Sequence, residues 1–352
     1  MNYISNIFRY LKRTMIFLIN KKVLAIIELV LIISLIRVTI SYKEIIKQNE
    51  KEMTLEPEHI NIQIYINKTE DNNNNSSMEK LKNCYQSNLL NKETQKYIDE
   101  LNNLYNESNQ YHSFLYQDLY SGLTISYNEL APIFTASTIK APAMIYLMEK
   151  ASKNEIDLNE ELTYTSNSYS KENRILKNNN QNISFNVDNL IEYTIRESDD
   201  IAYTMLMNKY GRETMLKYWN QLGTKRIFTL NTIWGVTSAK DASIYMNELY
   251  KFYKENSIYG EKLMNHFKNT SWKLITNKNG EYNTANKGGW SGETIHDIAI
   301  VFEKNPYILA IMSNTGESNY TYLFKKTSKL VGQLHEEYWK YKNEECSKSK
   351  QY

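Results

Sequence analysis

Residues 134–148 read Phe-Thr-Ala-Ser-Thr-Ile-Lys-Ala-Pro-Ala-Met-Ile-Tyr-Leu-Met. In this stretch Ser137 stands three residues before Lys140, and mostly apolar residues follow the lysine. A serine hydroxyl is a weak nucleophile until a base accepts its proton. A lysine three residues later in a helix lies on the same face, where it can act as that base. The stretch therefore predicts a buried helix that opens with a nucleophile, Ser137, and its base, Lys140.

The S-x-x-K spacing is not specific by itself, because the chain contains it at least four times, starting at Ser77, Ser137, Ser168 and Ser347. Ser77 lies in an Asn-rich linker and Ser347 in a polar tail, and neither has a rigid scaffold. Ser168 lies in a polar stretch with no apolar helix behind it. Only Ser137 follows a predicted hairpin and opens an apolar helix.

The patterns on both sides of Ser137 predict the fold class. Two strand-like runs, 111–120 and 123–127, meet at Ser121-Gly122, which is typical of a hairpin. Helical spacing then dominates to about residue 270, and strands return near the end. We predict an α+β fold, similar to an αβα sandwich, in which both ends of the domain build one antiparallel sheet around an inserted all-helical lobe. The remaining predicted elements are a helix capped by Asn91, strands 285–290, 296–303 and 307–313, and a helix over 321–341.

Two further elements accompany Ser137 in chain order. Ser198-Asp199-Asp200 lies in a predicted turn between two helices, where a second serine can relay a proton from Lys140 to a leaving group. Lys287-Gly288-Gly289-Trp290 lies on a predicted strand. A lysine on a sheet edge with small neighbours lets a substrate backbone lie alongside and be held electrostatically.

In this order the three elements resemble those of class A β-lactamases and penicillin-binding proteins, an active-site-serine hydrolase family. The resemblance covers roughly residues 90–340 and implies a β-lactamase/transpeptidase-like fold without metal or cofactor. It implies that Ser137 forms the acyl-enzyme, Lys140 is the general base, Ser198 shuttles the proton and Lys287 orients the substrate carboxylate. The implied substrate-binding residues are Asp200, Gly289, Trp290 and Ser291, and the backbone N–H groups of Ser137 and Trp290 would form the oxyanion hole. The ring of Trp290 would line the cleft or fill the core.

Three departures from the family pattern weaken the expected chemistry. Asp200 replaces an asparagine, and its charge beside Lys140 would favour the protonated lysine, which is a poorer base. Gly288 replaces a threonine or serine whose hydroxyl would meet the substrate carboxylate, and Ser291 could substitute for it. The interval 223–241 contains no glutamate to activate the deacylating water, and we predict that Asp241 serves the start of a helix instead. We also expect His296 and Asp297 to be structural.

The first 40 residues of the chain predict a membrane anchor. Residues 1–22 are basic, and residues 23–40 form an apolar run interrupted by Glu28 and Arg37. Eighteen helical residues span about 27 Å, close to the thickness of a bilayer core. Basic residues before the run place residues 1–22 in the cytoplasm and the rest outside the cell, in a single-pass protein of the cell membrane. A helix that lies on the membrane surface is the alternative.

We expect residues 41–88 to form a stalk and linker, 89–341 the serine hydrolase domain and 342–352 a polar tail. The chain has 352 residues and a net charge of +2, which gives no indication of nucleic-acid binding. Cys84 and Cys346 lie near opposite ends of this soluble part and are either paired in a disulfide or present as two thiols. We expect a monomer.

The sequence therefore predicts a membrane-anchored serine hydrolase that is acylated at Ser137 by a β-lactam or a cell-wall peptide. Deacylation should be slow, because no loop glutamate is available. One alternative is a D,D-peptidase of the penicillin-binding type. The other is a non-catalytic surface binding or sensor module on the same scaffold.

Overall fold

The computed structural model describes residues 61–66, 90–107, 111–168, 176, 182–225, 233–255, 258–314 and 320–348. All of them belong to one of two compact units, His59–Tyr352, and the other unit is Met1–Glu58. The predicted basic tail 1–22 and anchor 23–40 lie outside the described residues. Among the residues that are described, no helix is both long and apolar enough to cross a bilayer.

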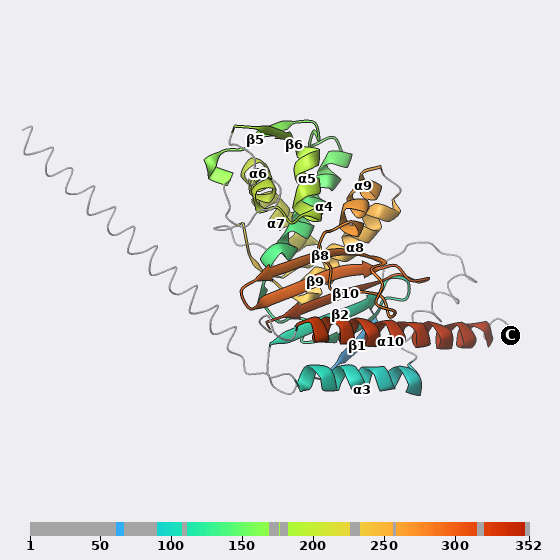
Figure 1. The fold of residues 1–352 in the computed structure, drawn as a ribbon. Coiled ribbons are helices and arrows are strands. Elements are labelled where there is room, and N and C mark those ends of the chain that lie inside the picture. Colours follow the sequence, from blue (N-terminus) through green and yellow to red (C-terminus); the bar gives the residue numbers. More distant parts are fainter. Residues whose placement is uncertain are drawn as a thin grey trace, which may run out of the picture. The chain divides into compact units, whose positions relative to one another are not determined.

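The described domain is built around an antiparallel sheet with the strand order β1-β3-β2-β10-β9-β8 (Figure 1). The chain contributes three strands before Ser137 and three after the helical lobe, so both ends of the domain build the sheet as predicted, although β1 was not among the strands predicted for the domain. In the centre, Leu309 of β10 is paired with Tyr116 of β2 on one side and Ala299 of β9 on the other. The strands are β1 Gln63–Ile66, β2 His112–Asp118, β3 Leu123–Tyr127, β8 Thr284–Ser291, β9 Thr294–Val301 and β10 Tyr307–Ser313.

The predicted hairpin lies between β2 and β3. Asp118 Oδ1 accepts hydrogen bonds from the backbone N–H groups of Tyr120 and Ser121, at 3.0 and 2.6 Å. Gly122 then adopts a φ of 74°, a conformation that glycine adopts without a steric cost. The dipeptide that indicated a turn in the sequence is thus the turn itself.

Strand β1 lies inside the segment 41–88 that we predicted to be a stalk and linker. It forms the outer edge of the sheet, where Ile64 is paired with Ile125 of β3. The hydroxyl of Tyr65 accepts a hydrogen bond from Lys240 Nζ at 2.6 Å and donates one to Glu129 Oε2 at 2.5 Å. The sheet therefore begins N-terminal to the predicted boundary at residue 89.

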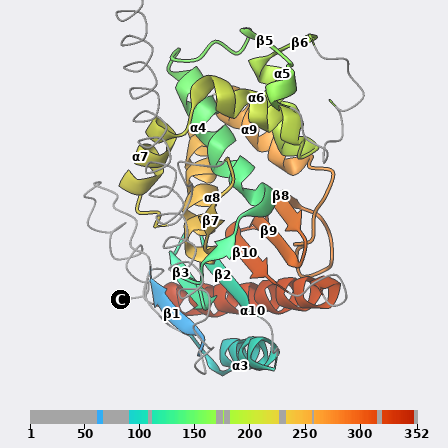
Figure 2. The same ribbon diagram turned by 90° about the vertical axis from the view of Figure 1, so that its left-hand side faces the viewer.

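Two helices, α3 Lys92–Asn106 and α10 Tyr320–Lys348, cover one face of the sheet (Figures 1 and 2). Asn91 caps α3, since its side chain accepts from Thr94 N at 2.9 Å, and Thr94 Oγ1 accepts from Asn91 N. Leu101 of α3 and Leu334 of α10 belong to the apolar core on this face. The N-cap predicted from sequence is confirmed.

The predicted polar tail 342–352 is wrong for its first half, because α10 continues to Lys348. Tyr338, Lys342 and Cys346 recur at intervals of four residues, so they lie on one face of the helix, and all three are fully buried. Lys342 places its ammonium 5.6 Å from the centroid of the Tyr338 ring. Cys346 is disulfide-bonded, and Cys84, the other cysteine of the chain, lies outside the described residues. The many charged residues of 342–352 favoured a solvated tail, but the residues spaced four apart form a buried helix face.

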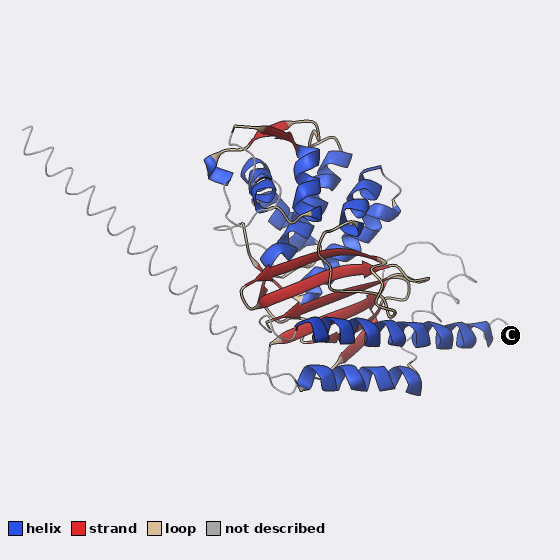
Figure 3. Cartoon of the chain, in the orientation of Figure 1, coloured by secondary structure: helices blue, strands red, loops and turns tan. Residues whose placement is uncertain are grey.

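A lobe of helices covers the opposite face of the sheet and forms a second core with it (Figure 3). Helix α4 Lys140–Ser152 runs through the middle of this lobe, and the indole of the buried Trp219 donates to Pro142 O at 3.2 Å. The predicted α+β architecture with an inserted helical lobe is confirmed. The other helices are η1 Ala136–Ile139, η2 Ser166–Ser168, α5 Val187–Arg196, α6 Asp200–Tyr210, α7 Glu213–Gln221, α8 Ala239–Lys254 and α9 Ile258–Lys268. Two small sheets pair β4 Ile133–Phe134 with β7 Val236–Thr237 and β5 Glu161–Thr163 with β6 Ser184–Asn186.

Candidate active site

Ser137 lies in the short helix η1 directly before α4. The residue before it, Ala136, has a φ of 43°, which is costly for a residue with a side chain. Thr138 Oγ1 closes the turn by donating to Thr135 O at 2.6 Å. The structure thus holds Ser137 at a strained turn between strand β4 and the buried helix.

Lys140 is fully buried, and its ammonium contacts both serines of the site. Its Nζ lies 3.1 Å from Ser137 Oγ, 3.2 Å from Ser198 Oγ and 2.8 Å from Ser198 O. Nζ also forms an ion pair with Asp200 Oδ1. Two aromatic rings flank it, with centroids at 5.8 Å for Tyr203 and 5.5 Å for Trp234. One lysine therefore contacts both candidate proton-transfer hydroxyls and a carboxylate.

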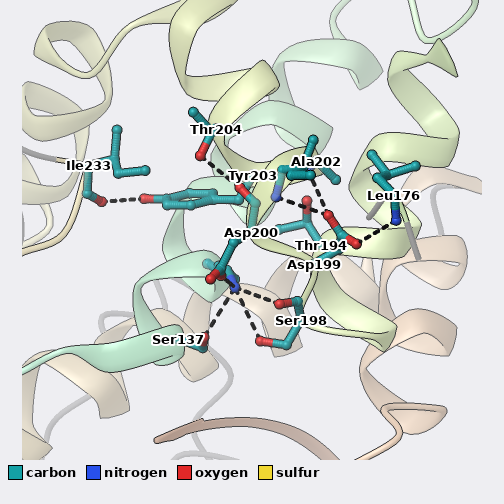
Figure 4. Close-up of polar contacts among 12 residues, drawn as sticks. Ser137, Leu176, Thr194, Ser198, Asp199, Asp200, Ala202, Tyr203, Thr204 and Ile233 are labelled. Carbon is teal, nitrogen blue, oxygen red and sulfur yellow. Dashed lines mark hydrogen bonds and ion pairs between the residues drawn. The ribbon is translucent and has the colours of Figure 1, made fainter. Parts of the chain in front are cut away.

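Ser198 occupies a turn whose backbone the sequence did not reveal. Its φ is 56°, in the left-handed region that few non-glycine residues adopt. The next residue, Asp199, is the N-cap of α6, and its Oδ1 accepts from Ile201 N and Ala202 N, both at 3.0 Å. Its Oδ2 accepts from Leu176 N at 3.0 Å. The buried Asp199 carboxylate fixes the turn that presents Ser198 and Asp200 (Figure 4).

Lys287 approaches from the edge strand β8, on the other side of Ser198. Its Nζ donates to Ser198 Oγ at 2.9 Å and to Gly288 O at 2.9 Å. Ser198 Oγ thus lies between Lys140 and Lys287. Lys140 is 58 residues before Ser198 in the chain and Lys287 is 89 residues after it, so the three sequence elements meet at the Ser198 hydroxyl.

Strand β8 lies directly against the turn that holds Ser137. A Cβ on Gly289 would stand 2.8 Å from Ser137 N and 2.9 Å from Thr138 N, so only glycine permits this approach. Trp290 follows with a largely exposed ring, and its Nε1 donates to Gly292 O at 3.0 Å. Of the two alternatives for this ring, the structure supports the cleft wall.

A pocket of about 470 Å³ opens beside Ser137. It includes all the predicted site residues except Lys140, which lies buried behind Ser137 and Ser198. Its lining also contains residues that were not among the predicted site residues. The lining residues are Ser137, Ile195, Arg196, Ser198, Asp200, Thr270, Ser271, Trp272, Lys287, Gly288, Gly289, Trp290, Ser291 and Gly292.

Trp272 explains the glycine at position 288. A Cβ on Gly288 would stand 2.0 and 2.1 Å from two ring carbons of Trp272, far inside van der Waals contact. The indole therefore occupies the space of any side chain at position 288. No sequence signal indicated this contact, because it joins two residues through tertiary packing alone.

His296 and Asp297 hold the scaffold around the site. His296 Nε2 donates to Phe134 O at 2.8 Å, Nδ1 accepts from Ser313 N at 3.2 Å, and burial lowers the pKa of this histidine to about 4. Its neutral ring ties strand β4, which leads to Ser137, to the central sheet. Burial raises the pKa of Asp297 to about 6, and its Oδ2 accepts from Leu274 N and Ile275 N. Both residues have the structural contacts that we expected of them.

The interval between the second and third elements contributes an aromatic ring to the site. Residues 226–232 lie outside the described part of the chain. Trp234 flanks Lys140, and Ile233 O accepts a 2.7 Å hydrogen bond from Tyr203 (Figure 4). Ser238 caps α8, and the buried Asp241 accepts from Lys225 N at 2.9 Å. The prediction that Asp241 serves the start of a helix is confirmed.

Among the described residues, no group of three or more His, Cys, Asp or Glu side chains is arranged to hold a metal ion. The chain matches the family described as the Beta-lactamase enzyme family over residues 81–339. It therefore belongs to this family of β-lactamase-like and penicillin-binding-protein-like serine hydrolases.

Solved structures share the fold at low sequence identity. PBP-A is 18% identical with a TM-score of 0.62, and the alignment covers 70% of this chain and 97% of that one. A PBP-A variant in an acyl-enzyme complex with penicillin G is 18% identical with a TM-score of 0.61, covering 69% and 96%. A β-lactamase from Sphaerobacter thermophilus is 12% identical with a TM-score of 0.59, covering 67% and 95%. No curated protein matches the chain in sequence.

Proposed function

We propose that this protein is an acyl-serine hydrolase whose nucleophile is Ser137. The observation that carries the proposal is the position of Lys140 Nζ, 3.1 Å from Ser137 Oγ and 3.2 Å from Ser198 Oγ. Lys287 closes the chain of contacts from the other side, 2.9 Å from Ser198 Oγ. An unbroken hydrogen-bonded path thus joins the nucleophile to a second hydroxyl in the pocket.

In the proposed reaction Ser137 Oγ attacks the carbonyl carbon of an acyl donor while neutral Lys140 accepts its proton. The backbone N–H groups of Ser137 and Trp290 stabilise the oxyanion. When the C–N or C–O bond of the donor breaks, Ser198 delivers a proton to the leaving group and regains one from Lys140. The electrons of the broken bond remain on the protonated leaving group, and the acyl group remains on Ser137.

We propose that the second half of the reaction is slow. Asp200 is the only carboxylate among the residues that line the described pocket, and it is engaged in an ion pair with Lys140. Without a positioned base for water, hydrolysis of an acyl-enzyme typically slows by about 10²–10⁴-fold. The proposed donors are β-lactams or cell-wall peptides, and a long-lived acyl-enzyme corresponds to a penicillin-binding or D,D-peptidase type of activity.

The proposal also includes the setting of the domain. Residues 23–40 would anchor the protein in the cell membrane and place the catalytic domain outside the cell as a monomer. A disulfide at Cys346 supports an oxidising location, because disulfides persist mainly outside the cytosol.

The ion pair between Lys140 and Asp200 favours a second candidate, a binding or sensor module that never forms an acyl-enzyme. The carboxylate stabilises the protonated lysine, which cannot accept the proton of Ser137. In this alternative the pocket holds its ligand reversibly, and Ser137→Ala leaves binding intact.

Intact-protein mass spectrometry after incubation with benzylpenicillin, and separately with its methyl ester, distinguishes the two candidates. We expect wild-type protein to gain the mass of at least one donor and Ser137→Ala to gain none. Decay of the adduct over hours supports the slow hydrolase. An unmodified wild-type protein with both donors, or equal labelling of Ser137→Ala, contradicts the proposed function.

A further inference from the structure

Two indole rings, those of Trp272 and Trp290, form an aromatic wall on the side of strand β8 that faces away from the Ser137 turn. Side chains alternate along a strand, so positions 288 and 290 point away from the side on which Lys287 and Gly289 meet the Ser137 turn. The ring of Trp272 covers position 288, and Trp290 occupies position 290 with 57% of its surface exposed. Both indoles line the same pocket as Ser137.

The chain on both sides of Trp272 is fixed. Before it, Ser271 N donates to Arg196 O at 2.8 Å, which ties the loop to the end of helix α5. After it, Leu274 N and Ile275 N both donate to the buried Asp297 at 2.8 Å. The backbone therefore holds the indole over Gly288, where it faces an approaching ligand.

This wall has a chemical consequence for a ligand that lies along β8. The face of an indole carries negative potential and cannot donate a hydrogen bond. An anionic group pressed against it would lose water without gaining a partner, which is unfavourable. A neutral group of the same size would instead bury apolar surface against the ring.

We propose that Trp272 is a specificity-determining residue, and that it makes the site select acyl donors that are uncharged where they lie against Gly288. The inference rests on the proposed function, since it concerns which donor acylates Ser137. Among the donors of the proposed function, it favours esters or amides whose neighbouring carboxyl group is blocked, such as a bond inside a peptide, over donors that end in a free carboxylate.

The two cationic side chains that line the pocket, Lys287 and Arg196, are not placed to hold a carboxylate against Trp272. Lys287 directs its ammonium to Ser198 Oγ and Gly288 O, on the other side of the strand from the indole. Arg196 is paired with Glu192 through Nη1 at 2.6 Å, which offsets its charge, and its buried Nε has no hydrogen-bond partner among the described residues. Ser291 stands on the same side as Lys287, so its hydroxyl faces away from the position that Trp272 covers.

The test compares two donors that differ only in this charge, benzylpenicillin and its methyl ester. The quantity measured is the ratio of their acylation rate constants, ester over acid, in wild type, Trp272→Phe, Trp272→Ala and the double variant W272A/G288T. The ratio cancels differences in folding and in intrinsic catalytic power. Trp272→Phe is the matched control because it keeps an aromatic face over Gly288.

We expect the ester to be favoured by wild type and by Trp272→Phe. In the double variant, a hydroxyl can replace the indole and donate to the carboxylate. Because hydrogen bonds to charged groups contribute about 1.5–3 kcal/mol, the ratio should fall at least about tenfold. Trp272→Ala should give an intermediate ratio. Circular dichroism verifies folding, and Trp272→Leu takes the place of Trp272→Ala if that variant does not fold.

An equal ratio in wild type and the double variant overturns the inference while leaving the proposed function intact. A wild-type preference for the free acid also overturns it, and would assign the carboxylate to Lys287 and Ser291. No adduct with either donor in any of the proteins overturns the proposed function and this inference together.

Discussion

Asp200→Asn removes the charge that holds Lys140 in its protonated form and changes little else. The side chain keeps its shape, and its amide oxygen can still accept a hydrogen bond from Nζ. In the wild type, Lys140 is fully buried and the Asp200 side chain is 11% exposed, so bulk water screens the ion pair only weakly. We expect the variant to form the acyl-enzyme faster at neutral pH.

The size of the effect follows from the contact. Two unit charges 4 Å apart attract by about 4 kcal/mol at an effective dielectric constant of about 20. The amide of the variant still accepts a hydrogen bond, and a buried ammonium is costly in either protein. These two effects offset about half of the attraction, which leaves a net effect of about 2 kcal/mol on the protonation of Lys140. About 2 kcal/mol corresponds to roughly a thirtyfold larger fraction of neutral Lys140, and the acylation rate constant should rise by a similar factor.

Time-resolved mass spectrometry of the adduct, or the burst of a chromogenic cephalosporin, measures this rate constant from pH 6 to pH 10. The acceleration should shrink as the pH rises, because a rising pH increases the neutral fraction of Lys140 in the wild type as well. Asp188→Asn is the matched control, since it removes a carboxylate that is paired with another lysine, Lys262, and that does not line the pocket. A variant at position 200 that is slower than wild type, or equal to it at every pH, would refute this reasoning and make the Asp200 carboxylate itself part of the proton path.

Three further predictions, one of them with a control variant, test the scaffold. His296→Asn removes a buried histidine whose pKa is lowered to about 4 from 6.5. The unfolded chain binds this proton first as the pH falls, so the free energy of unfolding decreases by up to about 3 kcal/mol between about pH 6.5 and pH 4. Urea denaturation should therefore show a flatter pH dependence in the variant, and an unchanged slope would contradict the assignment. Gly289→Ala places a Cβ 2.8 Å from Ser137 N and should slow acylation by about 10²-fold or more by moving the strand off the oxyanion position. Gly280→Ala, at a φ of 84° with open space around it, should reduce only thermal stability, and equal acylation rates in the two glycine variants would count against the close approach. Cys346→Ser should lower the free energy of unfolding by about 2–4 kcal/mol through loss of the disulfide, while an adduct that forms at the wild-type rate would show that the site does not depend on it.

The parts of the site that could be predicted from sequence are those with local chemical signatures. The spacing of Ser137 and Lys140 implies one helix face, and Ser198 follows a helix and precedes an Asp N-cap. Lys287 lies on a strand rich in small residues. Each signature depends on neighbours in the chain, so it survives in the sequence. The helices and strands could be predicted for the same reason, because residues such as Gly122 in the hairpin and Asn91 at the helix cap act on their neighbours in the chain.

The parts that could not be predicted depend on contacts between distant segments. Trp272 over Gly288 is such a contact, and the glycine alone was interpreted only as a lost hydroxyl. The residues around Tyr65 were assigned to the stalk, because a strand of four residues is assigned to the sheet only through its pairing with β3. Lys342 is polar by type, yet its aliphatic stem can be buried when the ammonium lies over an aromatic ring. In each case tertiary packing decides what the residue does.

The central claim is that Ser137 becomes acylated. It is tested most directly by digesting the penicillin-treated protein and mapping the adduct by tandem mass spectrometry. We predict one acylated peptide, the one that contains Ser137, which retains the adduct for hours and is unmodified in Ser137→Ala. An adduct on another residue, or no adduct with either benzylpenicillin or its methyl ester, would contradict the claim.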